Sequence, residues 1–113
     1  MCSKLIDIEV VKSRQELGLD FWESLLVMLA SEAPKTLKVL QENLDRNDYI
    51  NLSANAHKLK GMAANLGAEK LRSLNLKLEE GAIKSDRDDA ELRDLLASIE
   101  TTFLSSLEAL KKL

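Results

Sequence analysis

Residues 49–67, YINLSANAHKLKGMAANLG, decide how this chain folds. Their apolar side chains recur every three or four positions, which is the spacing of one face of an α-helix. That face consists of Leu52, Ala56, Leu59, Ala63 and Leu66. Gly67 follows the last apolar position, where a glycine commonly ends a helix in a left-handed conformation. The pattern therefore predicts a helix over about 49–66 with one buried face.

Four further helical segments are predicted around this one, so the chain belongs to the all-α class. They span about residues 7–17, 20–44, 68–84 and 89–111. Four long amphipathic helices joined by short turns pack most simply as an antiparallel up-down four-helix bundle. The short N-terminal helix is extra to that bundle, and we expect it to cap one end or to lie across a groove.

The segment over 20–44 needs a closer description because a proline interrupts its pattern. Pro34 lies inside the apolar repeat, which predicts a kink near Ser31 and not a domain boundary. Asp7 and Gly18 are the candidate cap residues of the preceding short helix. The inner face of the long helix is expected to comprise Phe21, Leu25, Met28, Leu29, Ala33, Leu37, Leu40 and Leu44.

Length and composition favour one folded domain over residues 1–113. Hydrophobic residues make up 45% of the chain and charged residues 31%. The net charge of -3 and the few aromatic residues argue against a nucleic-acid partner. The longest apolar run, over 25–30, is too short to cross a membrane. We therefore expect no membrane association. Cys2 is the single cysteine and cannot form an internal disulfide, so we expect a reducing, cytoplasmic location.

His57 is the only histidine, and it falls on the side of its helix away from the apolar face. A neutral imidazole is a good nucleophile near pH 7 and can accept a phosphoryl group on one ring nitrogen. Lys60 is one turn further on and would offset phosphate charge. Gly61 has no side chain to obstruct an approaching partner. The predicted docking face consists of Ala54, His57, Lys58, Lys60, Gly61 and Ala64, with apolar help from the first helix.

The segment around His57 resembles the signature of histidine-containing phosphotransfer (HPt) domains of bacterial-type multistep phosphorelays. The matching residues are His57, Leu59, Lys60, Gly61, Leu66, Gly67 and Ala68. Looser similarity extends over nearly the whole chain. Where the family commonly has small hydroxyl residues after the glycine, this chain has Met62 and Ala63. That departure removes hydroxyl contacts but leaves the nucleophile in place.

The resemblance implies a signalling intermediate and not an enzyme in its own right. His57 would take a phosphoryl group from a receiver-domain aspartate, or from a hybrid sensor histidine kinase, and pass it to another receiver. Lys60 would stabilise the phosphoryl oxygens, and Glu79 sits where the family places a polar residue that orients the imidazole. The chain would need no cofactor, and any Mg²⁺ would belong to the partner receiver domain. One docking face per chain makes a monomer the simpler expectation.

Two other functions stay open at this point. A helical adaptor would bind a signalling partner without chemistry and would not depend on His57. A hydrolase could use His57 as a general base, although no oxyanion donors or second nucleophile are apparent. The acidic run at Asp86, Asp88 and Asp89 lacks the glycine and distal glutamate of a calcium loop, so a solvated loop is expected there.

Overall fold

The computed structural model describes residues 4–113, and Cys2 lies outside this part. Within the described residues the regular structure is entirely helical, without strands, which confirms the all-α prediction. The five helices are α1 (Ile8–Gln15), α2 (Leu19–Asp45), α3 (Tyr49–Leu66), α4 (Glu69–Ala82) and α5 (Asp89–Lys111). None of the helices in this part has the length and apolar character needed to cross a membrane.

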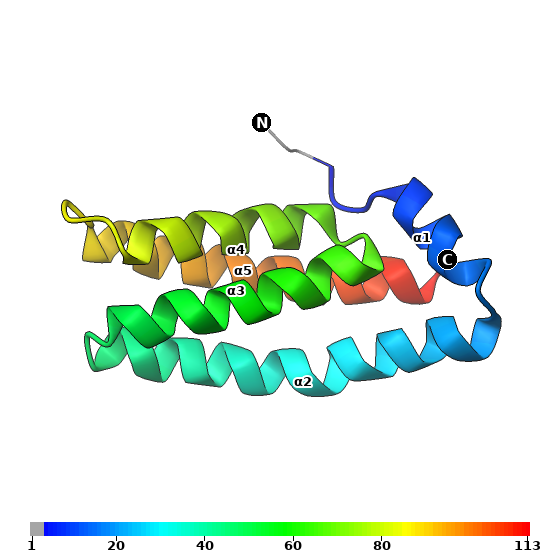
Figure 1. The fold of residues 1–113 in the computed structure, drawn as a ribbon, viewed down its shortest axis with the longest axis horizontal. Helices are drawn as coiled ribbons and strands as arrows, with labels where there is room; N and C mark the ends of the chain where they lie inside the picture. The colour runs from blue at the N-terminus through cyan, green and yellow to red at the C-terminus, as the bar shows by residue number, and fades with distance from the viewer. Residues whose placement is uncertain (1–3) are drawn as a thin grey trace.

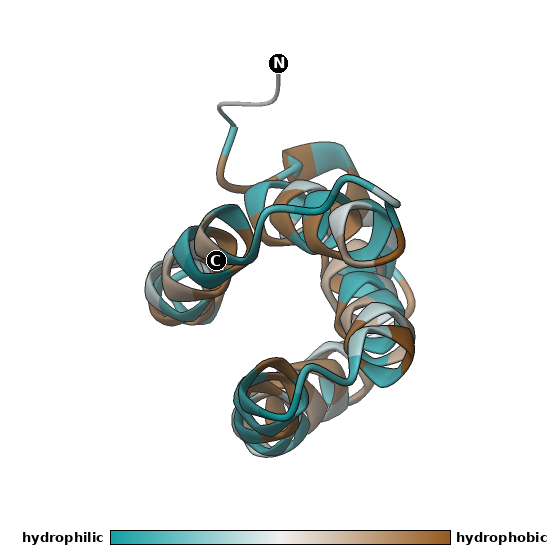
Figure 2. Cartoon of the chain, turned by 90° about the vertical axis from the view of Figure 1, so that its left-hand side faces the viewer, coloured by the Kyte–Doolittle hydropathy of each residue, from teal (hydrophilic) through white to brown (hydrophobic). Residues whose placement is uncertain are grey.

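The four long helices lie side by side along the long axis of the molecule (Figure 1), which measures 44 × 27 × 18 Å. α2 packs against α3 and α5, and α4 packs against the same two helices. α1 lies at one end, where it contacts α2 and α3, as expected of an end-capping helix. The view along the molecule shows α3 with neighbours on both sides and one face turned outward (Figure 2).

Side-chain caps and one glycine explain why α3 and α5 have the predicted bounds. The Asp48 carboxylate accepts a hydrogen bond from the backbone N–H of Asn51 at the start of α3. Gly67 ends α3 in the left-handed region with φ 75°. Asp88 caps α5 by accepting from the N–H groups of Ala90 and Glu91. These contacts satisfy backbone donors that a helix end otherwise leaves unpaired.

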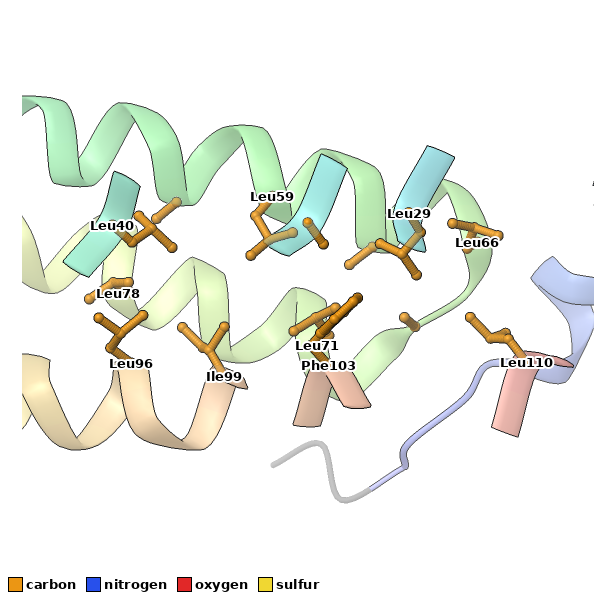
Figure 3. Close-up of a cluster of buried hydrophobic side chains, with 14 of the residues drawn as sticks. Leu29, Leu40, Leu59, Leu66, Leu71, Leu78, Leu96, Ile99, Phe103 and Leu110 are labelled. Carbon is orange, nitrogen blue, oxygen red and sulfur yellow. The ribbon is translucent and has the colours of Figure 1, made fainter. Parts of the chain in front are cut away.

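Leucine side chains from α2 to α5 fill the interior (Figure 3), and each fully buried leucine contributes about 1.5–3 kcal/mol before entropy is subtracted. The prediction that Phe21 and Met28 point inward is wrong, because they are 41% and 46% exposed. Trp22, which is only 4% exposed, is buried in place of Phe21. Both aromatic residues fit a helical repeat from Leu25, and the rotation of α2 buries Trp22, Leu25, Leu29, Ala33, Thr36, Leu40 and Leu44.

Two helix ends differ from the prediction. α4 stops at Ala82, two residues early, because the next residue, Ile83, is 66% exposed and would gain no burial. Gly18 does not end α1 in the left-handed α region; with φ 123° and ψ 147° it is the N-cap of α2. α2 continues through Pro34. A kink near Ser31 stays a prediction.

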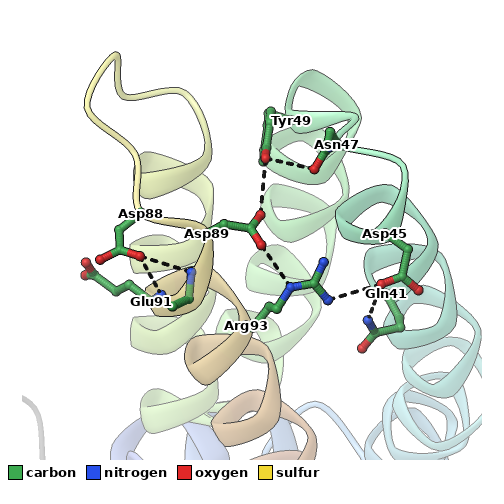
Figure 4. Close-up of polar contacts among 9 residues, drawn as sticks. Gln41, Asp45, Asn47, Tyr49, Asp88, Asp89, Glu91 and Arg93 are labelled. Carbon is green, nitrogen blue, oxygen red and sulfur yellow. Dashed lines mark hydrogen bonds and ion pairs between the residues drawn. The ribbon is translucent and has the colours of Figure 1, made fainter.

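At the end of the molecule away from α1, a polar network joins three helices (Figure 4). Arg93 of α5 donates to Asp89 at 2.9 Å and to Asp45 at the end of α2 at 3.1 Å. The Tyr49 hydroxyl donates to Asp89 at 3.1 Å and so adds the start of α3. Asp86 and Asp88 are exposed and lie in the loop before α5, as predicted, and Asp88 also caps that helix. Asp89 differs from the prediction, because it is partly buried and belongs to a network that joins three helices.

Candidate functional site

His57 lies on the outward face of α3, between the positions that bury the opposite face. Its side chain is 66% exposed, whereas Ala56 and Leu59 on either side of it are fully buried. The periodicity that packs α3 therefore also turns the imidazole to solvent. This placement agrees with the sequence prediction and leaves the ring accessible to a second protein.

Glu79 of α4 contacts the ring of His57. Its Oε2 lies 2.9 Å from Nδ1, which is the place that the resemblance implied for an orienting side chain. Ser53 helps to hold this part of α4 against α3, because its hydroxyl donates to the backbone carbonyl of Glu79 at 2.9 Å. That carbonyl is among the last four of α4, for which the helix offers no N–H partner.

The Ser53 contact was missed from the sequence. The available signal was a small hydroxyl residue one turn before the histidine on the same face of the helix. A serine in that place is common on any helix surface, and its partner lies 26 residues away in the chain. Only the packing of α4 on α3 identifies the acceptor.

Lys60 lies one turn after His57, as predicted, and its ammonium is bound to Glu79. Nζ is 2.7 Å from Oε1 of the carboxylate, and both side chains are 22% exposed. One carboxylate therefore contacts the imidazole through one oxygen and the ammonium through the other. The structure brings the three predicted residues together in a single cluster.

The electrostatics of the cluster decide which ring nitrogen is free. The Lys60 ammonium holds the pKa of Glu79 below its ordinary value, partial burial opposes this, and the contact with His57 adds to the lowering. An ionised carboxylate can only accept a hydrogen bond, so Nδ1 of His57 carries the proton that faces Oε2. Within the described residues Nε2 has no hydrogen-bond partner, and its lone pair is available to an electrophile.

The lowered pKa of Glu79 predicts how the cluster responds to acid. We expect Glu79 to titrate below its ordinary value of 4.5 in the folded protein. Its stabilising contribution is then complete above the pKa of the unfolded chain and is lost as the pH falls through the lowered pKa. Carboxyl ¹³C shifts followed against pH measure this directly. Lys60→Met should raise the pKa toward 4.5, and Lys58→Met should leave it unchanged; equal responses would contradict the ion pair.

The residues predicted to form the docking face are exposed except Lys60, which is partly buried. Ala54, Lys58, Gly61 and Ala64 surround His57 on the outer side of α3. A Cβ atom added at Gly61 would meet nothing within 4 Å, so the packing of this chain does not require a glycine there. Since glycine costs a helix about 0.5–1 kcal/mol relative to alanine, its presence favours a role outside the fold.

A groove of about 490 Å³ begins beside Gly61 and Ala64. Its apolar lining comes from α2 and α3, and α1 contributes the charged residue Arg14. The apolar contribution of α1 to the docking face stays a prediction. Arg14 Nε donates to the backbone and side-chain oxygens of Asn65 at 3.0 and 3.2 Å. His57 itself does not line this groove. The remaining lining residues are Leu25, Met28, Leu29, Met62 and Leu66.

The side chains give no sign of a metal centre in the described part. Among residues 4–113 no group of three His, Cys, Asp or Glu side chains is placed to hold an ion. Glu79, the carboxylate nearest His57, already contacts an imidazole and an ammonium. The chemistry of the cluster is that of a nucleophile, an acceptor that orients it and a cation.

Comparisons with known proteins agree with this geometry. The Hpt domain family matches residues 24–110, which is most of the chain. A solved structure of a histidine-containing phosphotransfer protein from rice superposes with a TM-score of 0.83 at 19% identity. That match covers 95% of this chain and 79% of the rice chain, and it shows a shared fold. Comparison with curated proteins gave no match. The chain therefore belongs to the Hpt domain family, whose proteins are histidine phosphotransfer intermediates of phosphorelays.

Proposed function

We propose that this chain relays phosphoryl groups through His57. A receiver-domain aspartate, free or within a hybrid sensor histidine kinase, donates the group, and the receiver of another response regulator accepts it. The scaffold for this relay is an antiparallel four-helix bundle of α2 to α5, with α1 as an accessory helix. The observation that carries the proposal is an exposed imidazole whose Nδ1 faces an ionised carboxylate at 2.9 Å, which leaves Nε2 as the nucleophile.

The transfer needs one bond to form and one to break. Nε2 of His57 attacks the phosphorus of the aspartyl phosphate, the N–P bond forms, and the O–P bond breaks to release the receiver carboxylate. The Nδ1 proton stays on the ring, which becomes an imidazolium bearing the phosphoryl group, and it remains hydrogen-bonded to Glu79. The return transfer to a second receiver reverses these steps. Any Mg²⁺ that offsets phosphoryl charge is expected in the acidic pocket of the receiver.

Lys60 supplies the cation for the phosphoryl oxygens. We expect Lys60→Ala to slow transfer about 10- to 100-fold, since a charge-assisted hydrogen bond contributes about 1.5–3 kcal/mol. Rapid-quench transfer from a phosphorylated receiver, with unfolding followed in parallel, measures the effect. Lys38→Ala is the matched control, because Lys38 is exposed on α2 and lies outside the docking face. Equal rates for the two variants would remove Lys60 from the mechanism.

Gly61 gives the receiver close access to α3, and the groove beside it offers the receiver a mainly apolar lining that also includes Arg14. We expect Gly61→Ala to stabilise the protein by about 0.5–1 kcal/mol, because the added methyl meets open space. The same change should slow phosphotransfer, and Gly61→Gln should slow it further. Chemical denaturation and transfer rates test both halves of the prediction.

The control for Gly61 is Ser105→Ala on the exposed side of α5. It improves helix propensity without touching the docking face, so its transfer rate should equal that of the wild type. A Gly61→Gln variant that transfers at the wild-type rate would show that the receiver does not approach this side of α3.

The experiment that tests the proposed function is transfer from a panel of phosphorylated receiver domains and hybrid kinases. Label on His57, located by mass spectrometry, with the acid-labile and base-stable behaviour of an N–P bond, supports the relay. The fastest donor then identifies the partner. A folded protein that takes no label from any donor would contradict the relay and favour an adaptor without chemistry.

A further inference from the structure

We propose that Glu79 binds the Lys60 ammonium beside His57 in the resting protein. When His57 is phosphorylated, the ammonium leaves Glu79 and binds the phosphoryl group. The inference rests on the proposed function and adds to it a change of partner by Lys60. The observation behind it is the shared carboxylate. Its Oε2 lies 2.9 Å from Nδ1 of the ring, and its Oε1 lies 2.7 Å from Nζ of the lysine.

In the resting protein the ammonium is engaged on the Nδ1 side of the ring. The phosphoryl group attaches to Nε2, whose lone pair points away from that side. Lys60 has a flexible four-carbon stem and lies one turn from His57, so its ammonium can reach either place by rotating about the bonds of its side chain. Its side chain is 22% exposed, which leaves room on the solvent side for that movement.

The charges of the cluster favour an exchange of partners. In the form that acts as a nucleophile the imidazole is neutral, and the carboxylate and the ammonium neutralise each other at 2.7 Å. After attack by Nε2 the ring carries a positive charge and the phosphoryl group carries about −1.5 to −2, as other protein phosphates do. The four charges then form two local pairs, with Glu79 against the imidazolium and Lys60 against the phosphoryl oxygens. Glu79 would keep its contact with Nδ1 throughout.

The exchange gives Glu79 a positioning role that a glutamine could fill only in part. A glutamine at this position could still accept from Nδ1 through its carbonyl oxygen, but it could neither bind the ammonium as an ion pair nor neutralise the imidazolium. Glu79→Gln is therefore expected to release Lys60 before any phosphoryl group arrives.

The test follows the lysine side chains by ¹H–¹³C NMR at the ε position, in wild type and in Glu79→Gln. Both proteins are observed before and after phosphorylation with phosphoramidate, a small N–P donor that needs no receiver. Before phosphorylation the Lys60 signal should differ between the two proteins. After phosphorylation it should move in both and reach closely similar positions, because Lys60 then has the same phosphoryl partner. Lys58, exposed on the same helix, is the internal control and should not move.

Three results would overturn the exchange. The wild-type Lys60 signal could stay at its resting position although mass spectrometry shows His57 phosphorylated; the relay would then stand without the exchange. Identical Lys60 signals in the two resting proteins would contradict the resting ion pair. A shift of the Lys58 signal on phosphorylation, without a shift of the Lys60 signal, would show that Lys58 contacts the phosphoryl group in place of Lys60. If His57 takes label neither from phosphoramidate nor from receivers, the proposed function fails and the exchange fails with it.

Discussion

A His57→Gln variant is expected to fold like the wild type and to accept no phosphoryl group from any donor that labels the wild type. Glutamine has no nucleophilic ring nitrogen, so the loss of transfer should be complete. Its amide can still donate to Glu79, and position 57 is 66% exposed, so stability should change by no more than about 0.5–1 kcal/mol. Intact-mass analysis after incubation with a phosphorylated receiver, together with a denaturation curve, measures both properties.

The control for this prediction is Lys38→Gln, which makes a similar change at an exposed position of α2 outside the docking face and should leave labelling intact. Label on a folded His57→Gln protein would mean that the acceptor is another side chain. Biological activity that survives the substitution in full would favour an adaptor, because an adaptor needs the surface of α3 and not its nucleophile.

The helix bounds that the sequence predicted correctly are those set by local chemistry. α3 begins after an aspartate that caps it and ends at a glycine with positive φ, and both signals are visible in residues 48–67. The inner face of α2 was predicted less well, since Phe21 and Trp22 both fit a helical repeat from Leu25. Which of them is buried depends on how α2 is rotated against α3 and α5, and periodicity alone does not specify that rotation.

The features of the site also divide into those that follow from local sequence and those that depend on how the helices pack. The outward position of His57 and its spacing from Lys60 follow from helical geometry, so the sequence was sufficient for them. The contact between His57 and Glu79 crosses from α3 to α4, and it was expected only because of the family resemblance. The ion pair of Lys60 with the same carboxylate was not expected, because its geometry depends on how closely two helices pack.

Gly67→Ala is expected to cause the largest loss of stability, roughly 2–5 kcal/mol. Part of the loss comes from the backbone, because φ 75° costs a residue with a Cβ atom about 1–2 kcal/mol. The remainder comes from crowding, which typically costs about 1–3 kcal/mol. The new Cβ would lie 2.8 Å from the backbone oxygen of Asp7 and 3.2 Å from Cβ of Val10. The loss should therefore exceed that of a simple helix terminator, which is the role that the sequence assigned to this glycine.

The crowding predicts which part of the structure is destabilised. The start of α1 is joined to the end of α3 by a hydrogen bond from the Asp7 N–H to the Gly67 carbonyl at 2.7 Å, which a displaced α1 would lose. Amide hydrogen exchange at Asp7 should therefore accelerate in Gly67→Ala. Gly67→Asn separates the two causes, because asparagine tolerates positive φ but keeps the Cβ clash. Full recovery of stability in that variant would show that backbone strain alone matters; partial recovery, which we expect, would show that α1 needs the bare backbone of Gly67 to pack against α3.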